Sequence, residues 1–487
     1  MLLDFDILIV TMCHLERKED VSRFMRTCQT LHAAGIPILL SGGVYLDEKR
    51  QITSFYNFMS TGNGRRYQHL TTLTISLYEW QEHQTKRMIW RLLYRSRALE
   101  KLEISNPEFT DEYLRCGDAI SMLPNLKELT MSWDDPSELQ GMFAKMVSKL
   151  TKVRLVFYPA DIWIDPIQGG IEPRWREPVP EDLGIRWINP VELLEKFTSS
   201  LEQLDVVSAG FTVTDIPYIN MKHLRIEWLG YPTLPSLVLA CPNLRTLITR
   251  CPHSDFPDVD VNEVRQYNQS FQQQTSWATL DYVSASVNEL HLLAICCKIR
   301  YLDLNCLETE EEAQMLSTVL PDCHPSILHI PFGEFNMELF PTIAQSIHSD
   351  LLHLILSVNL EPYSSVQAVR VLDLLLESLH PLSISKLQLN LRWTASGFKR
   401  LWRFPDENTK PVSTELFLTD LDPEALACRI ASSVPSLKYL SLEVNHGDRA
   451  KTYWQVEEEG SCRTSKGLDC ELGEKVIFKS EIEHPFR

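Results

Sequence analysis

A short pattern of apolar and polar residues recurs along most of the chain. Its form is L-x-x-L-x-L, in which another apolar residue can replace a leucine. Clear copies begin at Leu70, Leu99, Leu126, Leu150, Leu201, Met221, Leu244, Ile299, Leu351, Ile384 and Leu437. Weaker copies lie around Leu280, Leu328 and Leu416. With the second apolar position of each copy taken as its pivot, the fourteen copies run from Leu73 to Leu440, and the mean spacing of about 28 residues indicates a repeat.

The alternation within each copy predicts a short strand. Successive side chains of a strand point to opposite faces, so the leucines would face a core and the residues between them the opposite surface. The segments before the strands often have a helical pattern. Asn189 and Pro190 can cap and begin a helix in which Val191, Leu194 and Phe197 share one face.

Strand–helix units of this length are typical of a leucine-rich-repeat solenoid. The expected fold is therefore α/β, with parallel strands on a concave face, helices on the convex face, and each unit packed on its neighbours. The repeats are irregular, because the asparagine expected five residues after the pivot is present at Asn359 and Asn445 but replaced in other copies. An ordinary α/β domain with leucines in its strands is the alternative.

The polar positions beside the pivots predict a binding surface on the concave face. They are Lys101, Glu103, Glu128, Gln203, Asp205, His223, Arg225, Tyr301, Asp303, Lys386, Gln388 and Tyr439. Mixed charge with occasional tyrosine suits a protein or peptide partner better than a small molecule. The alternative for each residue is a solvated surface position without a partner.

Two stretches interrupt the repeat. Residues 158–190 contain six prolines together with Trp163 and Trp175, and residues 252–276 are polar and rich in glutamine. Long insertions of this kind are uncommon unless they are functional or disordered. The tryptophan-bearing insertion is therefore a candidate second target-binding site, and a packed structural loop is the alternative. Residues 446–487 contain no repeat and are expected to form a cap or a tail.

The N-terminal 45 residues have a different pattern from the repeats. Apolar residues from Ile7 to Leu15 are followed by a charged turn, residues 16–20, and by a second apolar helical run from Val21 to Leu31. Short helices with apolar residues on more than one face cannot bury all of them against each other. Either the solenoid or a partner must cover the rest. Residues 1–45 are thus expected to be a helical module, residues 46–69 a linker or first-repeat cap, and residues 70–445 the solenoid.

This N-terminal module resembles an F-box. The family pattern of an apolar run opening with Asp, a polar linker, and a helix that begins Asp-Val and ends Cys-x-x-Leu is matched by Asp6-Ile7-Leu8, Val10, Leu15, Asp20-Val21 and Cys28…Leu31. The usual Leu-Pro opening of the family is absent, and Asp4-Phe5 stands in its place. The order of a short F-box and degenerate leucine-rich repeats resembles the F-box/leucine-rich-repeat proteins of fungi.

The resemblance implies a substrate receptor of an SCF (Skp–cullin–F-box) ubiquitin ligase. The F-box would dock on a Skp-type adaptor and so join the cullin complex, the solenoid would hold a target protein, and the chain itself would perform no chemistry. The residues implied for adaptor docking are Ile7, Leu8, Met12, Leu15, Val21, Phe24, Met25 and Leu31. The alternative is a helical cap that shields the first repeat, in which these residues form its internal core and the chain is an interaction scaffold without ligase attachment.

Composition narrows the function and the compartment. The 487 residues carry a net charge of −18, which argues against nucleic acid as a partner because phosphate contacts need clustered lysine and arginine. The 12 cysteines have no zinc or disulfide spacing, so we expect reduced thiols in the cytoplasm or nucleus. No run of 18 apolar residues predicts a membrane span, and Asp4 and Asp6 argue against a signal peptide.

The sequence contains no complete motif for catalysis or cofactor binding. The stretch from Asp258 to Asn262 imitates a calcium loop, but Glu263 and Gln269 stand where that loop needs glycine and glutamate. The chain has no H-E-x-x-H or G-x-S-x-G motif and no phosphate-binding loop. A Cys/His pair brought together by the fold remains open. The expectation is no cofactor, no metal and no enzymatic activity; an enzyme carried on a solenoid is the remaining alternative.

Overall fold

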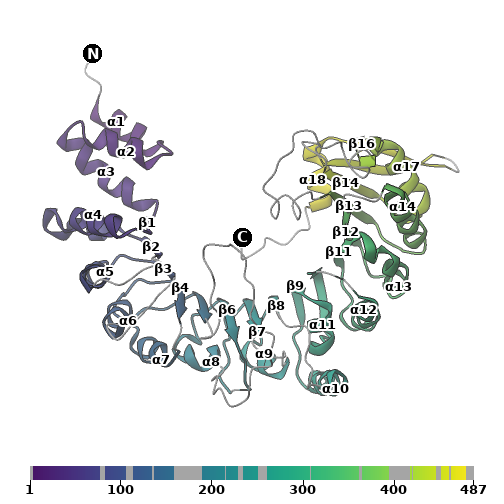
Figure 1. Ribbon diagram of the computed structural model, residues 1–487, viewed down its shortest axis with the longest axis horizontal. Helices are drawn as coiled ribbons and strands as arrows, with labels where there is room; N and C mark the ends of the chain where they lie inside the picture. Colours follow the sequence, from purple (N-terminus) through teal and green to yellow (C-terminus); the bar gives the residue numbers. More distant parts are fainter. Residues whose placement is uncertain are drawn as a thin grey trace. The chain divides into compact units, whose positions relative to one another are not determined.

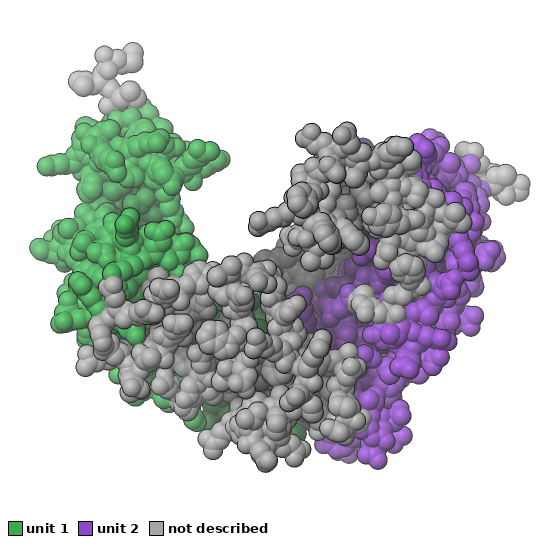
Figure 2. Space-filling view, viewed as in Figure 1, with its two compact units in different colours: residues 1–229, 239–242 green, residues 230–238, 243–487 purple. Residues whose placement is uncertain are grey.

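The computed structural model describes residues 4–76, 83–105, 113–133, 136–157, 189–213, 215–228, 234–250, 260–305, 307, 309–360, 365–393, 417–418, 420–445, 451–459 and 462–478. The chain forms two compact units (Figure 2). Unit 1 comprises residues 1–229 and 239–242, and unit 2 comprises residues 230–238 and 243–487. Across both units, the described residues contain sixteen strands of a mostly parallel sheet. The α/β class expected from the sequence is confirmed.

Unit 1 begins with three short helices, α1 (Phe5–Cys13), α2 (Lys18–Met25) and α3 (Gln29–Ser41). Asp4 caps α1 by accepting a hydrogen bond from the Asp6 amide at 3.3 Å. Helix α3 packs closely on α2, because a Cβ atom added at Gly35 would lie 2.3 Å from Met25 Cγ. Only glycine fits at this position unless Met25 moves.

The rest of unit 1 alternates strands and helices. Its elements are β1 (Val44–Leu46), α4 (Lys49–Ser60), the 3-10 helix η1 (Gly62–His69), β2 (Thr72–Ser76), α5 (His83–Arg95), β3 (Lys101–Ser105), α6 (Tyr113–Ser121), β4 (Glu128–Trp133), α7 (Pro136–Lys145), β5 (Lys152–Phe157), α8 (Pro190–Leu193), the 3-10 helix η3 (Glu195–Phe197), β6 (Gln203–Ala209) and β7 (His223–Trp228). Neighbouring strands from β1 to β7 pair in parallel in chain order.

The register of these strands aligns the pivots. Leu73, Leu102, Leu129, Val153 and Leu204 are successive partners across β2 to β6, and all are buried. The helices lie on one face of the strands (Figure 1). The pairing of β1 with β2 shows that the strand series already includes residues 44–46, before the first predicted copy at Leu70. Residues 46–69, expected to be a linker or first-repeat cap, contain helix α4.

Unit 2 continues the alternation. Helix α9 (Leu234–Ala240) lies where the chain passes between the units, and the elements that follow are β8 (Thr246–Arg250), α10 (Val261–Gln272), β9 (Thr279–Ala285), α11 (Val287–Leu293), β10 (Lys298–Leu304), α12 (Glu310–Cys323), β11 (Ile327–Gly333), the 3-10 helix η4 (Glu334–Leu339), α13 (Phe340–Ala344), β12 (His353–Leu360), α14 (Ser365–Leu379), β13 (Lys386–Trp393), α17 (Pro423–Ser433), β14 (Tyr439–Asn445), β15 (Thr452–Glu459), β16 (Cys462–Leu468) and α18 (Cys470–Phe478). The polar stretch predicted as an insertion at residues 252–276 thus contains helix α10.

Strands β8 to β14 also pair in parallel in chain order. The buried pivots Leu302, Leu328 and Leu354 are successive register partners across β10 to β12. In β9, however, the residue aligned with Leu302 is Val283, and Leu280 pairs with Ile299. The predicted pivot at Leu280 is therefore wrong by three residues, because the β9 copy has valine where its neighbours have leucine.

Local capping explains where several helices begin. Asn189 Oδ1 accepts a hydrogen bond from the Val191 amide at 3.1 Å, and Pro190 occupies the first helical position, as predicted. Thr309 and Glu312 form a reciprocal capping box at the start of α12, each side chain bonding the other's backbone amide at 3.1 Å. These caps satisfy amides that have no partner within the helix.

The C-terminal segment ends the parallel series of unit 2. Strand β15 pairs antiparallel with β14, and β16 pairs antiparallel with β15. Helix α18 then packs beside β14 and β15, on the face opposite to the helices of the repeats (Figure 1). Among the described helices of the whole chain, none combines the length and the apolar character needed to cross a bilayer.

The connections between the elements differ at the two ends of the strands. Helix-to-strand turns vary little in length, as from α6 to β4 and from α17 to β14, whereas strand-to-helix connections range from the single residue between β9 and α11 to much longer segments. The longest segments outside the described residues, 158–188 and 394–416, both follow a strand, β5 and β13 respectively. The predicted insertion and its Trp163 and Trp175 thus lie outside the described residues, apart from its last two positions.

Candidate functional site

The N-terminal module has a closed core made of half of the predicted docking residues. Met12, Val21 and Met25 are buried together, with Leu15 and Phe24 packed against them at the margin. Leu31 is buried as well. Met12, Val21, Met25 and Leu31 are therefore unavailable for docking in the folded module, and the prediction that they contact an adaptor is corrected. Three short helices can bury this many apolar side chains because α2 approaches α3 closely at Gly35.

The other predicted docking residues are accessible to different degrees. Ile7 is 56% exposed, whereas Leu8, Leu15 and Phe24 are half-buried. Val10, one turn beyond Ile7 on α1, is 57% exposed, and Phe5 at the start of the helix is exposed too. Phe5 lies two residues before Ile7 and therefore on a different side of the helix, so we call Ile7 and Val10 alone the α1 apolar surface. Sequence reasoning missed the contribution of Val10, although the three-residue spacing of Ile7 and Val10 places them on one helical face.

The predicted concave positions of unit 1 lie side by side on its strands and form two charged groups. In the first group, Lys101, Glu128 and Lys152 are register partners on β3, β4 and β5. The Glu128 carboxylate forms an ion pair with each lysine, with N–O distances of 3.3 Å to Lys101 and 3.2 Å to Lys152. Burial raises the pKa of Glu128, but the two lysines outweigh this effect and the pKa is lowered. Glu128 therefore stays ionised between them.

In the second charged group, the carboxylate of Asp205 lies between two arginines. Arg154 Nε is 3.4 Å from Asp205 Oδ2, and Arg225 Nε is 3.9 Å from Asp205 Oδ1. Asp205 is buried while Arg154 is exposed, so the accessible charge of this group is positive. Gln203 and His223 are register partners beside it, and Glu103 accepts a hydrogen bond from Thr74 at 3.5 Å.

The strands of unit 2 carry a hydrogen-bonded chain of polar side chains on the same face. Tyr282 donates to Asp303 Oδ2 at 2.6 Å, and His329 Nδ1 lies 2.6 Å from Asp303 Oδ1. His329 Nε2 lies 2.9 Å from Ser357 Oγ, which also accepts from Asn390 Nδ2 at 3.0 Å. The predicted residues Tyr301 and Asp303 belong to this region, because the rings of Tyr301 and Tyr282 are 5.3 Å apart.

The order Asp303, His329 and Ser357 has the distances of a serine-hydrolase relay, but its surroundings do not suit acyl transfer. Ser357 lies within β12, which pairs with β11 and β13 on its two sides, so its backbone amides are engaged in the sheet. Among the described residues, no pair of N–H groups is thereby left beside Ser357 to stabilise an oxyanion. Ser357 is also only 7% exposed. The geometry fits a network that holds polar side chains in place.

The chain itself covers two of the predicted binding positions near the C-terminus. Lys386 Nζ donates a hydrogen bond to the Val476 carbonyl of α18, and Gln388 is buried. Tyr439, the register partner of Lys386, is half-buried. The prediction that Lys386 and Gln388 are open to a target is therefore corrected. Helix α18 occupies this end of the polar face in unit 2.

A buried histidine belongs to the same row of side chains. His353 is the register partner of Lys386, and neither of its ring nitrogens has a hydrogen-bond partner among the described residues. Burial lowers the pKa of His353 to about 3, and the charges of Lys386 and Lys451 act in the same direction. The imidazole is therefore neutral in the folded chain.

This histidine makes stability depend on pH. In the unfolded chain a histidine has a pKa near 6.5, so it is protonated below that pH. In the folded chain His353 stays neutral down to about pH 3. The contribution of His353 to the free energy of unfolding should therefore be greatest above pH 6.5. This contribution should fall by roughly 2 kcal/mol between pH 6.5 and 5. Urea unfolding of His353→Leu should lose this part of the slope. The exposed-site variant His380→Leu should keep it, and an unchanged slope in His353→Leu would contradict the assignment.

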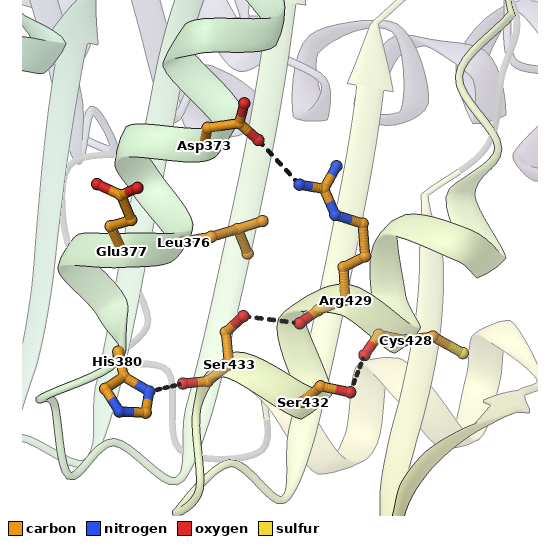
Figure 3. Close-up of a pocket in the computed structure, with 8 residues that line it drawn as sticks. All are labelled: Asp373, Leu376, Glu377, His380, Cys428, Arg429, Ser432 and Ser433. Atoms are coloured by element: carbon orange, nitrogen blue, oxygen red, sulfur yellow. Dashed lines mark hydrogen bonds and ion pairs between the residues drawn. The ribbon is translucent and has the colours of Figure 1, made fainter.

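A hollow of about 690 Å³ lies between α14 and α17 in unit 2 (Figure 3). Arg429 in its wall already pairs with Asp373 at 2.9 Å. His380 and Cys428 both line the hollow, but Cys428 Sγ points away from His380 (Figure 3) and lies 3.2 Å from Ser465 Oγ. The Cys/His pair that sequence alone left open does not form here.

Comparison with known proteins adds no family to these observations. No protein-family model matches the chain, and no curated protein is similar to it.

Proposed function

We propose that the chain is a non-catalytic substrate-recognition subunit of an SCF-type ubiquitin ligase. Helices α1 to α3 serve as an F-box that docks on a Skp-type adaptor and thereby joins the cullin complex. The strand–helix units serve as a leucine-rich-repeat solenoid whose polar face binds a target protein in the cytoplasm or nucleus. An interaction scaffold of the same fold without ligase attachment is the alternative.

The α1 apolar surface is the observation that carries the proposal. The helical module already has its own core of Met12, Val21 and Met25, so Ile7 and Val10 are not needed to hold it together. A cap that only shields the first repeat would bury its surplus apolar residues against that repeat, yet both remain more than half exposed. Exposed apolar side chains gathered on one short helix are typical of a protein-docking site.

The polar face of unit 1 supports target binding. Arginine and lysine side chains from β3, β5 and β7 surround the carboxylates of Glu128 and Asp205. Carboxylates held in this way keep the basic groups in fixed positions, and fixed charges give an interface specificity. No described side chain in this group has the arrangement of a nucleophile with its base, which agrees with a binding role.

Complex formation with a purified Skp-type adaptor tests the proposal. The full chain, mixed with the adaptor, should elute from a sizing column as a stable complex and should recruit the cullin subunit through the adaptor. If the folded chain and the adaptor elute separately at micromolar concentrations, the ligase proposal fails and the scaffold without ligase attachment remains.

A further inference from the structure

Three potential metal ligands gather at two consecutive turns of unit 2. His324 ends helix α12 just before β11, and His348 and Asp350 lie between α13 and β12. One ring nitrogen of each histidine and a carboxylate oxygen of Asp350 all lie within 4.8 Å of one another. None of the three residues belongs to the surfaces described above.

The side chains converge in a defined geometry. The rings of His324 and His348 meet edge to face, with centroids 4.9 Å apart. Asp350 turns back toward His348: its backbone amide donates to His348 Nδ1 at 3.3 Å, and its carboxylate oxygen lies 3.6 Å from the same nitrogen. Nδ1 is therefore the nitrogen of His348 that faces the Asp350 carboxylate, and a metal ion bound between them would replace the long hydrogen bond from the Asp350 amide.

His324 carries a buried nitrogen without a protein partner. Its Nδ1 is shielded from solvent and makes no hydrogen bond with any described residue. A buried polar atom left unpaired costs free energy, and in native structures such an atom is often explained by a water molecule or an ion. A metal ion between the turns would provide the missing partner.

We propose that His324, His348 and Asp350 bind a divalent transition-metal ion, of which Zn²⁺ is the best match. Zinc takes imidazole nitrogen and carboxylate oxygen at about 2.0–2.2 Å, which places tetrahedral ligands about 3.4 Å apart. Side-chain rotations bring atoms already within 4.8 Å to that distance. Two nitrogen ligands disfavour Ca²⁺ and Mg²⁺, which prefer oxygen. Water completes the coordination.

The bound ion would cross-link the turn before β11 to the turn before β12. Binding to the folded state alone stabilises it in proportion to the logarithm of metal concentration over Kd. The inference is independent of the proposed ligase function, since it concerns neither α1 nor the polar face of the strands. Sequence spacing did not predict it, because His324 and His348 come from different repeats and match no zinc motif.

Titration of the chelator-treated full chain with Zn²⁺ tests the proposal. Calorimetry should show one more bound equivalent in the wild type than in His324→Ala or in Asp350→Asn, which keeps the shape of the side chain. Zn²⁺ at a hundredfold excess over Kd should raise Tm by roughly 3 °C in the wild type and not in these variants. The matched control His380→Ala removes an exposed imidazole of the same unit and should behave as the wild type.

Spectroscopy of Co²⁺ bound in place of Zn²⁺ keeps the test valid if a variant folds poorly. The wild-type complex should show the visible absorption of cobalt in a low-coordinate site with nitrogen ligands, and the control His380→Ala should match it. Equal equivalents and equal Tm shifts in the wild type, His324→Ala and Asp350→Asn would overturn the proposal. So would a cobalt spectrum of the fully hydrated ion in the wild type.

Discussion

Replacing Ile7 with aspartate should lower the affinity for a Skp-type adaptor by more than about 100-fold, equivalent to about 2.7 kcal/mol. Ile7 is 56% exposed on α1, so the carboxylate costs little in the free chain. In the complex the same carboxylate would enter an apolar contact without a partner, and burial of an unpaired charge is expensive. Val10→Asp, one turn along the same face, should have a comparable effect. Surface plasmon resonance with immobilised adaptor measures both.

The matched control is Val147→Asp. Val147 is an apolar residue of unit 1 that is 55% exposed and lies outside the helical module, so its replacement changes charge equally without touching the docking surface. The three variants should have the helical content of the wild type by circular dichroism. Retention of adaptor affinity by both Ile7→Asp and Val10→Asp would remove the α1 apolar surface from the docking site and with it the main support for the proposed function.

Truncating a pivot leucine should produce the largest loss of stability. Leu354 in β12 is fully buried between its register partners Leu328 and Leu387. Leu354→Ala should lower the free energy of unfolding by about 2–5 kcal/mol, because the lost contacts leave a cavity that the sheet cannot close. Leu352, two positions earlier, is 57% exposed, and Leu352→Ala should change stability by no more than about 0.5 kcal/mol.

Urea unfolding followed by tryptophan fluorescence compares these two variants directly. Both changes remove the same atoms from neighbouring positions of the same chain segment, so the difference between them reports burial alone. Similar losses in Leu354→Ala and Leu352→Ala would show that the register that places Leu354 inside and Leu352 outside is incorrect.

The strand pattern could be predicted because one periodicity carries it. Alternation of leucine with polar residues gives the buried face of each strand directly, and the pivots at Leu102, Leu129 and Leu204 align in the structure as expected. The pattern failed where composition departs from leucine. Strand β1 is only three residues long and has no hexamer, and β9 uses Val283 where the prediction chose Leu280.

The candidate surfaces were predicted less completely, since each depends on contacts between distant segments. Hydrophobic pattern alone does not say whether Met12 or Ile7 faces the interior of a three-helix module; the close approach at Gly35 decides it. Parity placed Lys386 on the polar face, but its hydrogen bond to the Val476 carbonyl depends on α18, which lies far along the chain and contains no repeat. Neighbouring ion pairs such as Arg154 with Asp205 follow from register, which only the structure supplies.

The unequal connections at the two ends of the strands bear on how such a chain diversifies. Short helix-to-strand turns set the offset between one repeat and the next, so a residue gained or lost there would shift pivots out of line. A strand-to-helix segment such as 158–188 or 394–416 can change length while β5 and β13 keep their register. Loop-closure cost grows slowly with length. New recognition elements can thus be grafted at that edge, by evolution or by an engineer, without redesign of the core.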